Sequence, residues 1–273
     1  MLFTLQKKQK RRLKSFIVVL FGLYLMIGSA LHFFQEKLLF LPTTLEQDYQ
    51  YKFDYPFEEL FLKTEDATIN ALHFKCDNPK GVILYFHGNA GDLSRWGKIT
   101  EYFVTQHYDV LVMDYRTYGK SIGKLSEGVF YKDAQFCYNF LLQQQYLEEN
   151  ITLYGRSLGT GIASYLASAN QPKQLILETP YYSILDVVEQ RFPMFPVKQL
   201  LKYQFPTFKY LPKANCPITI IHGTDDKIVP YASGKKLSGL KLQNLDFKTV
   251  EGGSHNNLIE FEDYHITIKT ILK

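Results

Sequence analysis

The sequence contains few residues that could hold a metal ion or build a disulfide framework. It has only three cysteines, which lie far apart without a C-x-x-C pair, and we expect free, buried thiols. They are Cys76, Cys137 and Cys216. No H-E-x-x-H motif and no cluster of cysteine and histidine occurs, which argues against a catalytic metal.

Nucleotide-binding loops are absent as well. No G-x-G-x-x-G follows an expected strand, so a dinucleotide site is not predicted. The tripeptide Gly119-Lys120-Ser121 resembles the end of a phosphate-binding loop, but Asp114 stands where that loop requires its first glycine. We therefore expect no cofactor.

The excess of positive charge is confined to one end of the chain. The net charge is +4, yet residues 1–40 contain seven Lys/Arg and one Glu, and the remainder contains 24 basic and 26 acidic residues. The body of the protein is thus slightly acidic, and a nucleic-acid partner is not predicted.

A long uncharged run follows the basic end. Residues 15–34 contain no charged residue and are mostly apolar. Twenty residues at a helical rise of about 1.5 Å span about 30 Å, the thickness of a bilayer core. We interpret residues 15–34 as a transmembrane signal anchor after a basic cytoplasmic N-terminus, residues 1–14, because basic residues hold that end in the cytoplasm.

The rest of the chain then lies on the non-cytoplasmic side, in the periplasm if the protein is bacterial. A cleaved signal peptide is the alternative, with Gly28-Ser29-Ala30 as its cleavage site. The apolar pattern continues past that tripeptide to Phe34, which favours a retained anchor.

The remaining sequence divides into a linker, residues 35–56, and one domain, residues 57–273. The linker is apolar enough to lie on the membrane or on the domain. In the domain, a hairpin precedes a regular alternation of strands and helices, which predicts a mostly parallel eight-stranded sheet covered on both faces. The expected strands are 59–63, 68–75, 82–86, 109–113, 151–154, 174–178, 218–221 and 246–250. The expected helices are 92–106, 126–146, 162–169, 231–240 and 256–272.

The motif G-x-S-x-G occurs between an expected strand and a helix rich in small residues. It comprises residues 155–159, with Ser157 at its centre. In this context the motif predicts a nucleophile elbow, in which a sharp turn with positive φ exposes the serine hydroxyl and the glycines permit close packing. The N–H of Leu158 would open the helix and face the same point, which makes it a candidate oxyanion donor.

A serine nucleophile needs a base and an acid that orients the base. His255 lies in a glycine-rich loop directly after the last strand and is the expected base. The other downstream histidines are His222, at a strand end, and His265, within the last helix. Asp225 and Asp226 follow another strand, and either could hold the base. Glu178 is a third candidate, or a residue that bonds backbone amides in the loop beyond it.

Six short blocks, the third of which is the pentapeptide itself, make a wider pattern. They are His87-Gly88-Asn89-Ala90-Gly91-Asp92, Asp114-Tyr115-Arg116 with Tyr118-Gly119-Lys120-Ser121, Gly155-Arg156-Ser157-Leu158-Gly159, Glu178-Thr179-Pro180-Tyr181, His222-Gly223 with Asp226 and Val229-Pro230, and Gly253-Ser254-His255. In order and spacing, these blocks resemble membrane-anchored serine hydrolases of the α/β-hydrolase superfamily, of the Bem46/ABHD12–ABHD13–ABHD17-like type. The resemblance covers the chain from about residue 35 to its end.

The resemblance implies an α/β-hydrolase fold and several roles. In similar proteins the acid is the fourth residue after the histidine of the His-Gly pair, which selects Asp226. The backbone N–H of Asn89 becomes a second oxyanion donor beside that of Leu158, and His87 fixes this loop. Two departures stand out: Thr117 occupies a position that is often glycine, and an aspartate common near Pro206 is absent.

These residues predict a membrane-anchored serine hydrolase that cleaves carboxylic ester or thioester bonds through an acyl-enzyme. The insertion at residues 181–217 is long enough for a small cap and is rich in aromatic residues. With the anchor, it favours a small-molecule or lipid-like acyl ester as substrate. A serine peptidase related to aminopeptidases is one alternative, although no acidic cluster for a free amino group is evident. A non-catalytic membrane scaffold on a hydrolase fold is the other.

Overall fold

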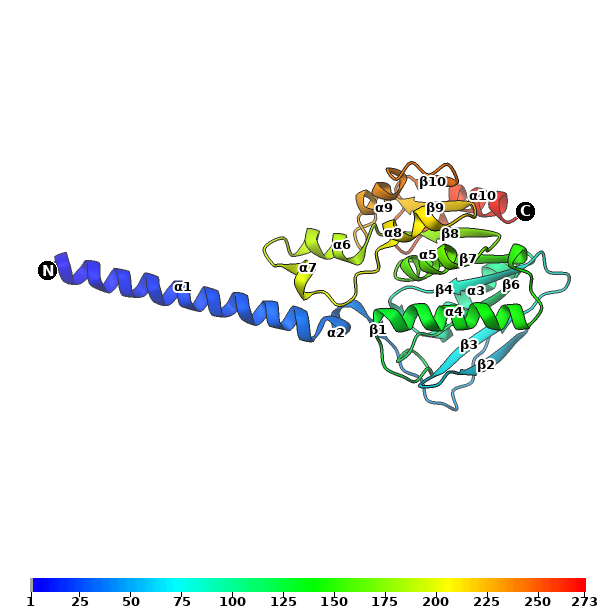
Figure 1. Ribbon diagram of the computed structural model, residues 1–273, viewed down its shortest axis with the longest axis horizontal. Coiled ribbons are helices and arrows are strands. Elements are labelled where there is room, and N and C mark those ends of the chain that lie inside the picture. The colour runs from blue at the N-terminus through cyan, green and yellow to red at the C-terminus, as the bar shows by residue number, and fades with distance from the viewer. Residues whose placement is uncertain (1) are drawn as a thin grey trace.

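A central eight-stranded sheet organises the protein in the computed structural model, which describes residues 2–273, with side chains from Lys8 onward (Figure 1). Its strand order is β10-β9-β8-β7-β4-β6-β3-β2. All neighbours are parallel except β2–β3 and β3–β6. The strands are β2 (Phe57–Lys63), β3 (Thr68–Phe74), β4 (Val82–Phe86), β6 (Asp109–Met113), β7 (Ile151–Arg156), β8 (Gln174–Glu178), β9 (Ile218–Gly223) and β10 (Leu245–Val250). The predicted mostly parallel sheet is therefore confirmed.

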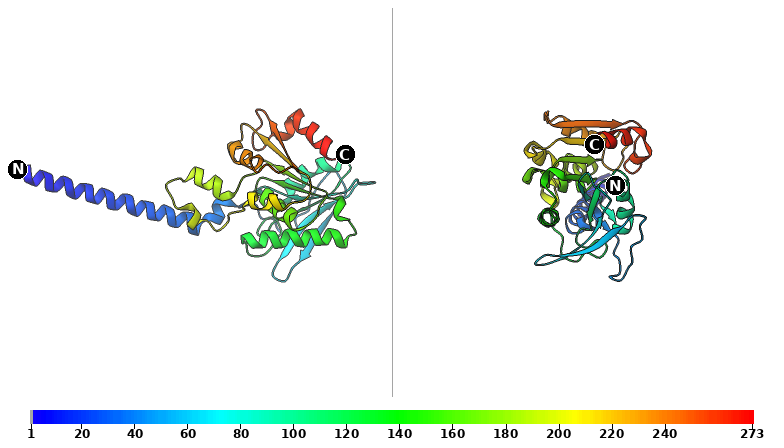
Figure 2. Two further views of the ribbon diagram at one scale, coloured as in Figure 1. Left: turned by 45° about the horizontal axis from the view of Figure 1, so that its top comes forward. Right: turned by 90° about the vertical axis from the view of Figure 1, so that its right-hand side faces the viewer.

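Helices cover both faces of this sheet (Figure 2). They are α3 (Leu93–Val104), α4 (Glu127–Gln143), α5 (Gly159–Ala169), α9 (Tyr231–Ser238) and α10 (Glu262–Ile271). Side chains of α4, α5 and α9 join one apolar core, and those of α3 and α10 join a second core on the opposite face. Strands β4, β6, β7 and β8 are buried at every position, as expected for strands covered on both sides.

Side-chain caps begin two of these helices. Asp92 accepts a hydrogen bond from the N–H of Ser94 at the start of α3, and Ser126 accepts one from the N–H of Val129 at the start of α4. Such a cap typically stabilises a helix by about 1 kcal/mol. The first helix after the hairpin is thereby fixed directly behind the loop that follows β4.

The predicted start of the last helix was wrong: the helix expected at residues 256–272 begins only at Glu262. Residues 258–260 form a separate 3-10 turn, and Phe261 is extended (φ −101°, ψ 135°) before α10 begins. The side chain of Asn257 accepts hydrogen bonds from the N–H and hydroxyl of Ser254, so it belongs to the loop that carries His255. The prediction for Cys76 was also wrong: all three cysteines are free, but this one is only half-buried.

The expected linker packs on the domain. It contains the short helix α2 (Gln35–Leu39) and the strand β1 (Leu41–Pro42), which pairs in parallel with β5 (Ala90–Gly91). Phe40 between them is 3% exposed and packs against the rings of Phe130 and Tyr203. The chain after the N-terminal helix is thus tied to the loop that follows β4.

The N-terminal helix α1 (Leu2–Phe33) projects from the body of the protein (Figure 1). Its segment Lys8–Phe33 is, by length and composition, apolar enough to cross a membrane, and none of it is buried inside the protein. The segment between β8 and β9 contains three short helices, α6 (Ile184–Arg191), α7 (Val197–Leu200) and α8 (Thr207–Tyr210). This cap extends from the sheet toward the end of α1 (Figure 1).

Candidate active site

The turn between β7 and α5 places Ser157 in the left-handed region, with φ of +51°. Close packing explains the glycines on either side. A Cβ at Gly155 would lie 2.6 Å from the carbonyl oxygen of Gly159, and a Cβ at Gly159 would lie 2.0 Å from that of Phe86. The turn therefore has the strained geometry of a nucleophile elbow, and it directs the hydroxyl away from the strand.

The structure brings Ser157, His255 and Asp226 together. His255 Nε2 lies 2.9 Å from Ser157 Oγ, and His255 Nδ1 lies 2.7 Å from Asp226 Oδ2. A carboxylate can only accept, so Nδ1 carries the ring proton and Nε2 accepts from the serine hydroxyl. All three residues are less than 9% exposed.

Asp226 is held as a carboxylate by several donors. Its Oδ1 accepts hydrogen bonds from the N–H groups of Ile228 and Val229, and Oδ2 lies 3.2 Å from His222 Nε2 as well as close to His255. Burial alone would raise the pKa of Asp226. The hydrogen bonds from His222, His255 and the backbone outweigh burial and hold the pKa well below its usual value.

Neither of the other two candidate acids, Asp225 and Glu178, contacts the imidazole of His255. Asp225 is exposed and its only side-chain hydrogen bond among the described residues is a long one, 3.5 Å, from Thr224. Glu178 is buried, accepts the hydroxyl proton of Tyr154 and pairs with Arg156 at 3.2 Å. Neither reading of Glu178 is therefore met: it does not contact His255, and it faces Arg156 across the β7–β8 register instead of bonding backbone amides.

Two residues with a place in the site were missed from the sequence. The guanidinium of Arg156 donates to the carbonyls of His255 and Asn256 at 3.4 and 3.5 Å, and it lies 5.5 Å above the ring of Trp96. It thereby connects the elbow strand to the histidine loop. In the motif, this position counts only as an arbitrary residue, so no local pattern pointed to its contacts.

His222 is the second of these residues. Its Nε2 lies 3.1 Å from the carbonyl of Val229 and 3.2 Å from Asp226 Oδ2. Its Nδ1 is buried without a partner among the described residues, and a Cβ at Gly234 would come within 2.1 Å of it. His222 therefore packs behind Asp226 as a second imidazole on the same carboxylate. His265 is far from this site and contacts the Tyr102 hydroxyl instead.

The loop after β4 carries Asn89, whose backbone is fixed on its carbonyl side. That carbonyl accepts hydrogen bonds from the N–H of Leu41 and the hydroxyl of Tyr118, both at 2.8 Å. The side chain of Asn89 donates to the carbonyl of Leu39 at 3.1 Å. Within residues 2–273, neither the N–H of Asn89 nor that of Leu158 donates to another protein group, so both remain able to bind a ligand oxygen.

His87 anchors the start of the same loop. Its Nδ1 lies 2.7 Å from the carbonyl of Gly88, and its Nε2 lies 3.3 Å from Asp114 Oδ1. The ring stacks on Trp96, and its own carbonyl accepts the hydroxyl proton of Tyr115. These contacts fit the expectation that His87 fixes the loop.

The turn after β6 is secured by Arg116. Its guanidinium pairs with Asp133 on α4 and with Asp66 in the hairpin turn, each at 2.8 Å. The next residue, Thr117, has φ of +73°, a conformation that favours glycine and is unfavourable for a β-branched side chain. The departure noted in the sequence therefore coincides with a strained backbone.

A pocket of about 280 Å³ opens at Ser157. Apart from Ser157, Asn89 and Arg191, its walls are apolar or aromatic, with contributions from α2, α6 and the β9–α9 loop. A smaller apolar cavity of about 60 Å³ adjoins it between α1, α2 and the cap, and the two share Leu38, Leu39, Val188 and Phe192. In the part of the chain that the structure describes, no three His, Cys, Asp or Glu residues gather as metal ligands.

Sequence comparison agrees with this architecture. The family model described as "Serine aminopeptidase, S33" matches residues 77–213. An uncharacterized protein of Acanthamoeba polyphaga mimivirus is 31% identical over 222 residues, which cover 72% of this chain and 75% of the relative. The lysophosphatidylserine lipase ABHD12 of Danio rerio is 30% identical over 206 residues, covering 67% of this chain but only 52% of the lipase. Alpha/beta hydrolase domain-containing protein 17C of Mus musculus is 28% identical over 222 residues, which cover 79% of this chain and 67% of that protein.

Solved structures show the same fold at lower identity. The Pyrococcus furiosus esterase Pf2001 superposes with a TM-score of 0.68 at 16% identity and covers 86% of this chain and 96% of its own. The esterase Est1E of Butyrivibrio proteoclasticus, solved with ferulic acid, gives a TM-score of 0.64 at 16% identity, covering 78% and 100%. From the family match, these relatives and the fold, the chain belongs to the α/β-hydrolase family, with ABHD12 and domain-containing protein 17C among its relatives.

Proposed function

We propose that this protein is a membrane-anchored serine hydrolase that cleaves carboxylic ester or thioester bonds of lipid-like acyl substrates. Ser157 is the nucleophile, His255 the general base and Asp226 the orienting acid. The observation that carries the proposal is the pair of hydrogen bonds from Ser157 through His255 to Asp226, at 2.9 and 2.7 Å. Ser157 and His255 are 98 positions apart in the sequence, and His255 and Asp226 are 29 positions apart. The fold nevertheless brings the hydroxyl, the imidazole and the carboxylate into the chain of hydrogen bonds that this chemistry requires.

The reaction follows from this geometry. Ser157 Oγ attacks the carbonyl carbon of the substrate while His255 Nε2 takes its proton. Asp226, ionised over the physiological pH range, stabilises the resulting imidazolium. The imidazolium then protonates the leaving alcohol or thiol, and an acyl-serine remains. Water, deprotonated by His255, releases the acid and restores the hydroxyl.

The oxyanion of each tetrahedral intermediate is assigned to two backbone donors, the N–H groups of Leu158 and Asn89. Both lie on fixed backbone: one opens α5, and the other is held by hydrogen bonds to its own carbonyl. A donor of this kind contributes about 3–4 kcal/mol to transition-state stabilisation, and the helix N-terminus adds to the favourable potential.

The pocket supports an acyl substrate. Its apolar walls offer little to a polar or charged group, and the single charged side chain that lines it, Arg191, already donates to the carbonyls of Lys227 and Ile228. Each methylene moved from water to such walls contributes about 0.8 kcal/mol. That one relative is a lysophosphatidylserine lipase is consistent with a lipid-like substrate.

We assign α1 as the membrane anchor. Its basic residues precede the uncharged run, residues 15–34, which supports an orientation with the N-terminus in the cytoplasm and the catalytic domain on the other side. The exposed apolar side chains along α1, from Leu13 to Ile27, would then face lipid.

A peptidase is the second candidate, because the matching family model is described as a serine aminopeptidase. Such an enzyme needs a carboxylate near the nucleophile to hold a free amino group. The residues that line the pocket at Ser157 include no aspartate or glutamate. The ester proposal is therefore the stronger of the two.

A series of p-nitrophenyl esters from acetate to palmitate, presented in detergent micelles, tests the substrate class. We expect kcat/KM to rise with chain length up to a medium or long chain and the Ser157→Ala variant to be inactive on all of them. Cleavage of acetate alone would contradict a lipid-like substrate. Faster cleavage of amino-acid p-nitroanilides than of any ester would favour the peptidase.

A further inference from the structure

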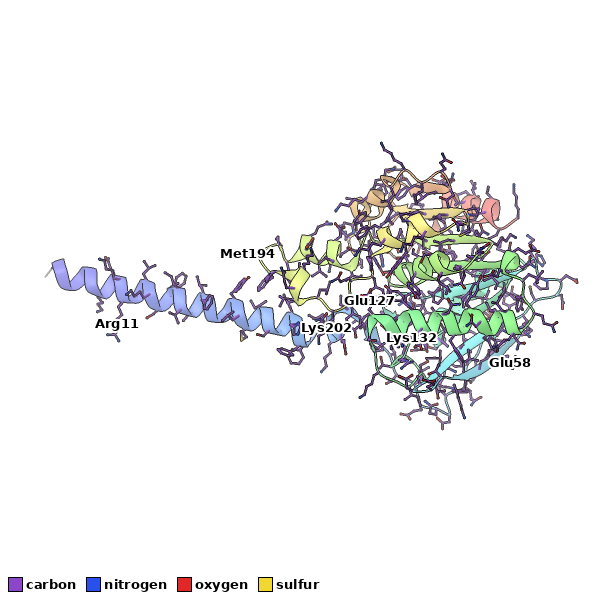
Figure 3. The ribbon with its side chains drawn as sticks, in the orientation of Figure 1. Arg11, Glu58, Glu127, Lys132, Met194 and Lys202 are labelled. Carbon is purple, nitrogen blue, oxygen red and sulfur yellow. The ribbon has the colours of Figure 1, made fainter. Side chains whose placement is uncertain are left out.

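The cap extends a loop along the side of α1. This cap loop, residues 192–197, runs from the end of α6 to the first residue of α7, and Met194 lies at its outer tip (Figure 3). The ring of Phe195 stacks on Tyr24 of α1, with centroids 4.7 Å apart and planes 5° from parallel. The hydroxyl of Tyr24 donates to the carbonyl of Met194 at 3.2 Å.

The contact between Tyr24 and the cap loop lies near the middle of the apolar run, well away from the end of α1 that adjoins the domain. Because an α-helix rises about 1.5 Å per residue, Tyr24 lies about 13 Å from the helix end at Phe33. The expected span, residues 15–34, is about 30 Å long, so Tyr24 lies near its middle. Any membrane crossed by that span would surround the cap loop as well.

Further hydrogen bonds fix the cap to the end of α1 and the start of α2. His32 Nδ1 lies 2.9 Å from the carbonyl of Leu200, and Gln35 donates to the same carbonyl at 3.1 Å. The side chain of Gln35 also accepts the N–H of Lys202 at 2.7 Å. Tyr203 donates to Glu36 at 2.8 Å. These polar contacts lie at the level where the helix leaves the apolar run, and they fix residues 200–203, which follow α7, beside the end of α1.

The side chains of the cap loop suit hydrocarbon. Residues 192–197 read Phe-Pro-Met-Phe-Pro-Val, without a charged or hydrogen-bonding side chain. Met194 is 81% exposed and Phe192 is 37% exposed, although both are large and apolar. Arg191 and Lys198 flank the loop, and such long basic side chains can extend to the headgroup level. On a surface that faces only water, an apolar protrusion of this kind would be unfavourable.

The backbone of the cap loop suits hydrocarbon too. In lipid, each N–H must find a partner within the protein. Pro193 and Pro196 have no N–H, and the N–H groups of Phe192, Phe195 and Val197 donate to carbonyls inside the segment 188–195. Most backbone donors of the loop are therefore satisfied within the protein.

We propose that the cap loop inserts into the hydrocarbon of the bilayer that α1 crosses, as a second membrane-embedded element. The inference rests on the proposed anchor. It also gives the small apolar cavity an occupant, because that cavity lies between the loop and the end of α1 and is lined by Leu31, Phe192 and Val197. An acyl chain of a bilayer lipid can pass from the hydrocarbon through this cavity into the pocket at Ser157, with which the cavity shares four residues.

Depth-dependent quenching of a fluorophore tests the insertion in the full chain, reconstituted in vesicles. Cys137 and Cys216 are buried, so a Cys76→Ser background leaves no exposed thiol among the described residues. Three variants, each with one introduced cysteine, then carry the same maleimide fluorophore: Met194→Cys in the cap loop, Val18→Cys on α1, and Ile266→Cys on α10 at the far side of the domain. The native side chains at these sites are 81%, 69% and 54% exposed. The quencher is a phosphatidylcholine with a nitroxide on its acyl chain.

We expect strong quenching at residues 194 and 18 and little at residue 266. Quenching at residue 18 without quenching at residue 194 would overturn the insertion and leave the anchor intact. Absence of quenching at residue 18 would overturn both.

A kinetic arm separates insertion from catalysis. Met194→Glu places a charge in the cap loop. Residue 194 does not line the pocket at Ser157, so the substitution leaves that pocket intact. We expect at least tenfold slower hydrolysis of an ester embedded in vesicles, with hydrolysis of soluble p-nitrophenyl acetate unchanged. Met194→Leu is the matched control and should act as wild type on both. Equal rates of Met194→Glu and wild type on the embedded ester would contradict the proposal.

Discussion

Replacement of Asp226 by asparagine should abolish the base function of His255 while it preserves the fold around the site. The asparagine oxygen can still accept the N–H groups of Ile228 and Val229, which bond Asp226 Oδ1 at 2.9 Å. Its amide NH₂ then faces His255 Nδ1 at the position of Oδ2, 2.7 Å away. An NH₂ group donates, so Nδ1 must accept, and the ring proton moves to Nε2.

That tautomer presents an N–H to Ser157 Oγ and cannot take its proton. In serine hydrolases with this triad, the same change lowers kcat by about 10⁴-fold, which corresponds to about 5.5 kcal/mol in the activation free energy. We expect a decrease of about 10³- to 10⁴-fold here, with KM little changed because Asp226 does not line the pocket.

The adjacent aspartate offers a matched control. Asp225 is exposed and has only a long hydrogen bond from Thr224, so Asp225→Asn should stay within about twofold of wild type. The assay is kcat on a short-chain p-nitrophenyl ester in detergent, with the melting temperature of each variant recorded beside it. A loss below tenfold for Asp226→Asn, or an equal loss for Asp225→Asn, would refute the reasoning.

Two further predictions concern stability. The pKa of Asp226 is lower in the folded state than in the unfolded chain, where it is about 4. The ionised carboxylate therefore stabilises the folded state at any pH above about 4. This contribution is lost as the pH falls from about 4 toward the folded-state pKa. Denaturant unfolding from pH 6 to pH 3 should therefore show the stability difference between wild type and Asp226→Asn shrinking below about pH 4; a constant difference would contradict the assignment. Thr117→Gly should stabilise the protein by about 1 kcal/mol, because the left-handed φ of +73° costs a residue with a Cβ about 1–2 kcal/mol and glycine loses part of that gain to chain entropy. In a domain of this size the melting temperature should rise by about 2–4 °C, and a decrease would show that the turn is not strained.

The elements with strong local patterns could be predicted from the sequence. The buried strands are short apolar runs, and the alternation of strand and helix permits few arrangements other than a parallel sheet. Ser157 and His255 could be found because each lies in a glycine-marked loop directly after a strand. Between Asp225 and Asp226, however, the residues alone gave no choice, since both follow the same strand and only the fold turns one of them toward the imidazole.

Features that depend on tertiary contact could not be predicted. The strand β1 has two residues, too few for a periodic signal, and it exists only because β5 pairs with it. The contacts of Arg156 depend on Glu178 across the sheet and on a loop about 100 residues away. No sequence pattern marks His32, yet its ring Nδ1 lies 2.9 Å from the carbonyl of Leu200 in the cap. The break before α10 lies in a stretch whose apolar residues recur at helical spacing on both sides of Phe261, so the pattern does not mark it.

The most direct test of the central claim is covalent labelling of the full-length protein by a fluorophosphonate, followed by mass spectrometry of the adduct. The probe reacts only with a serine whose hydroxyl is activated by a base. The site must also supply oxyanion donors to the phosphonyl oxygen of the probe. We predict a single adduct on Ser157, its complete loss in Ser157→Ala, and strongly slowed labelling in His255→Ala. Absence of labelling in the folded native protein, or an adduct that persists in Ser157→Ala, would contradict the account and would favour a non-catalytic membrane scaffold.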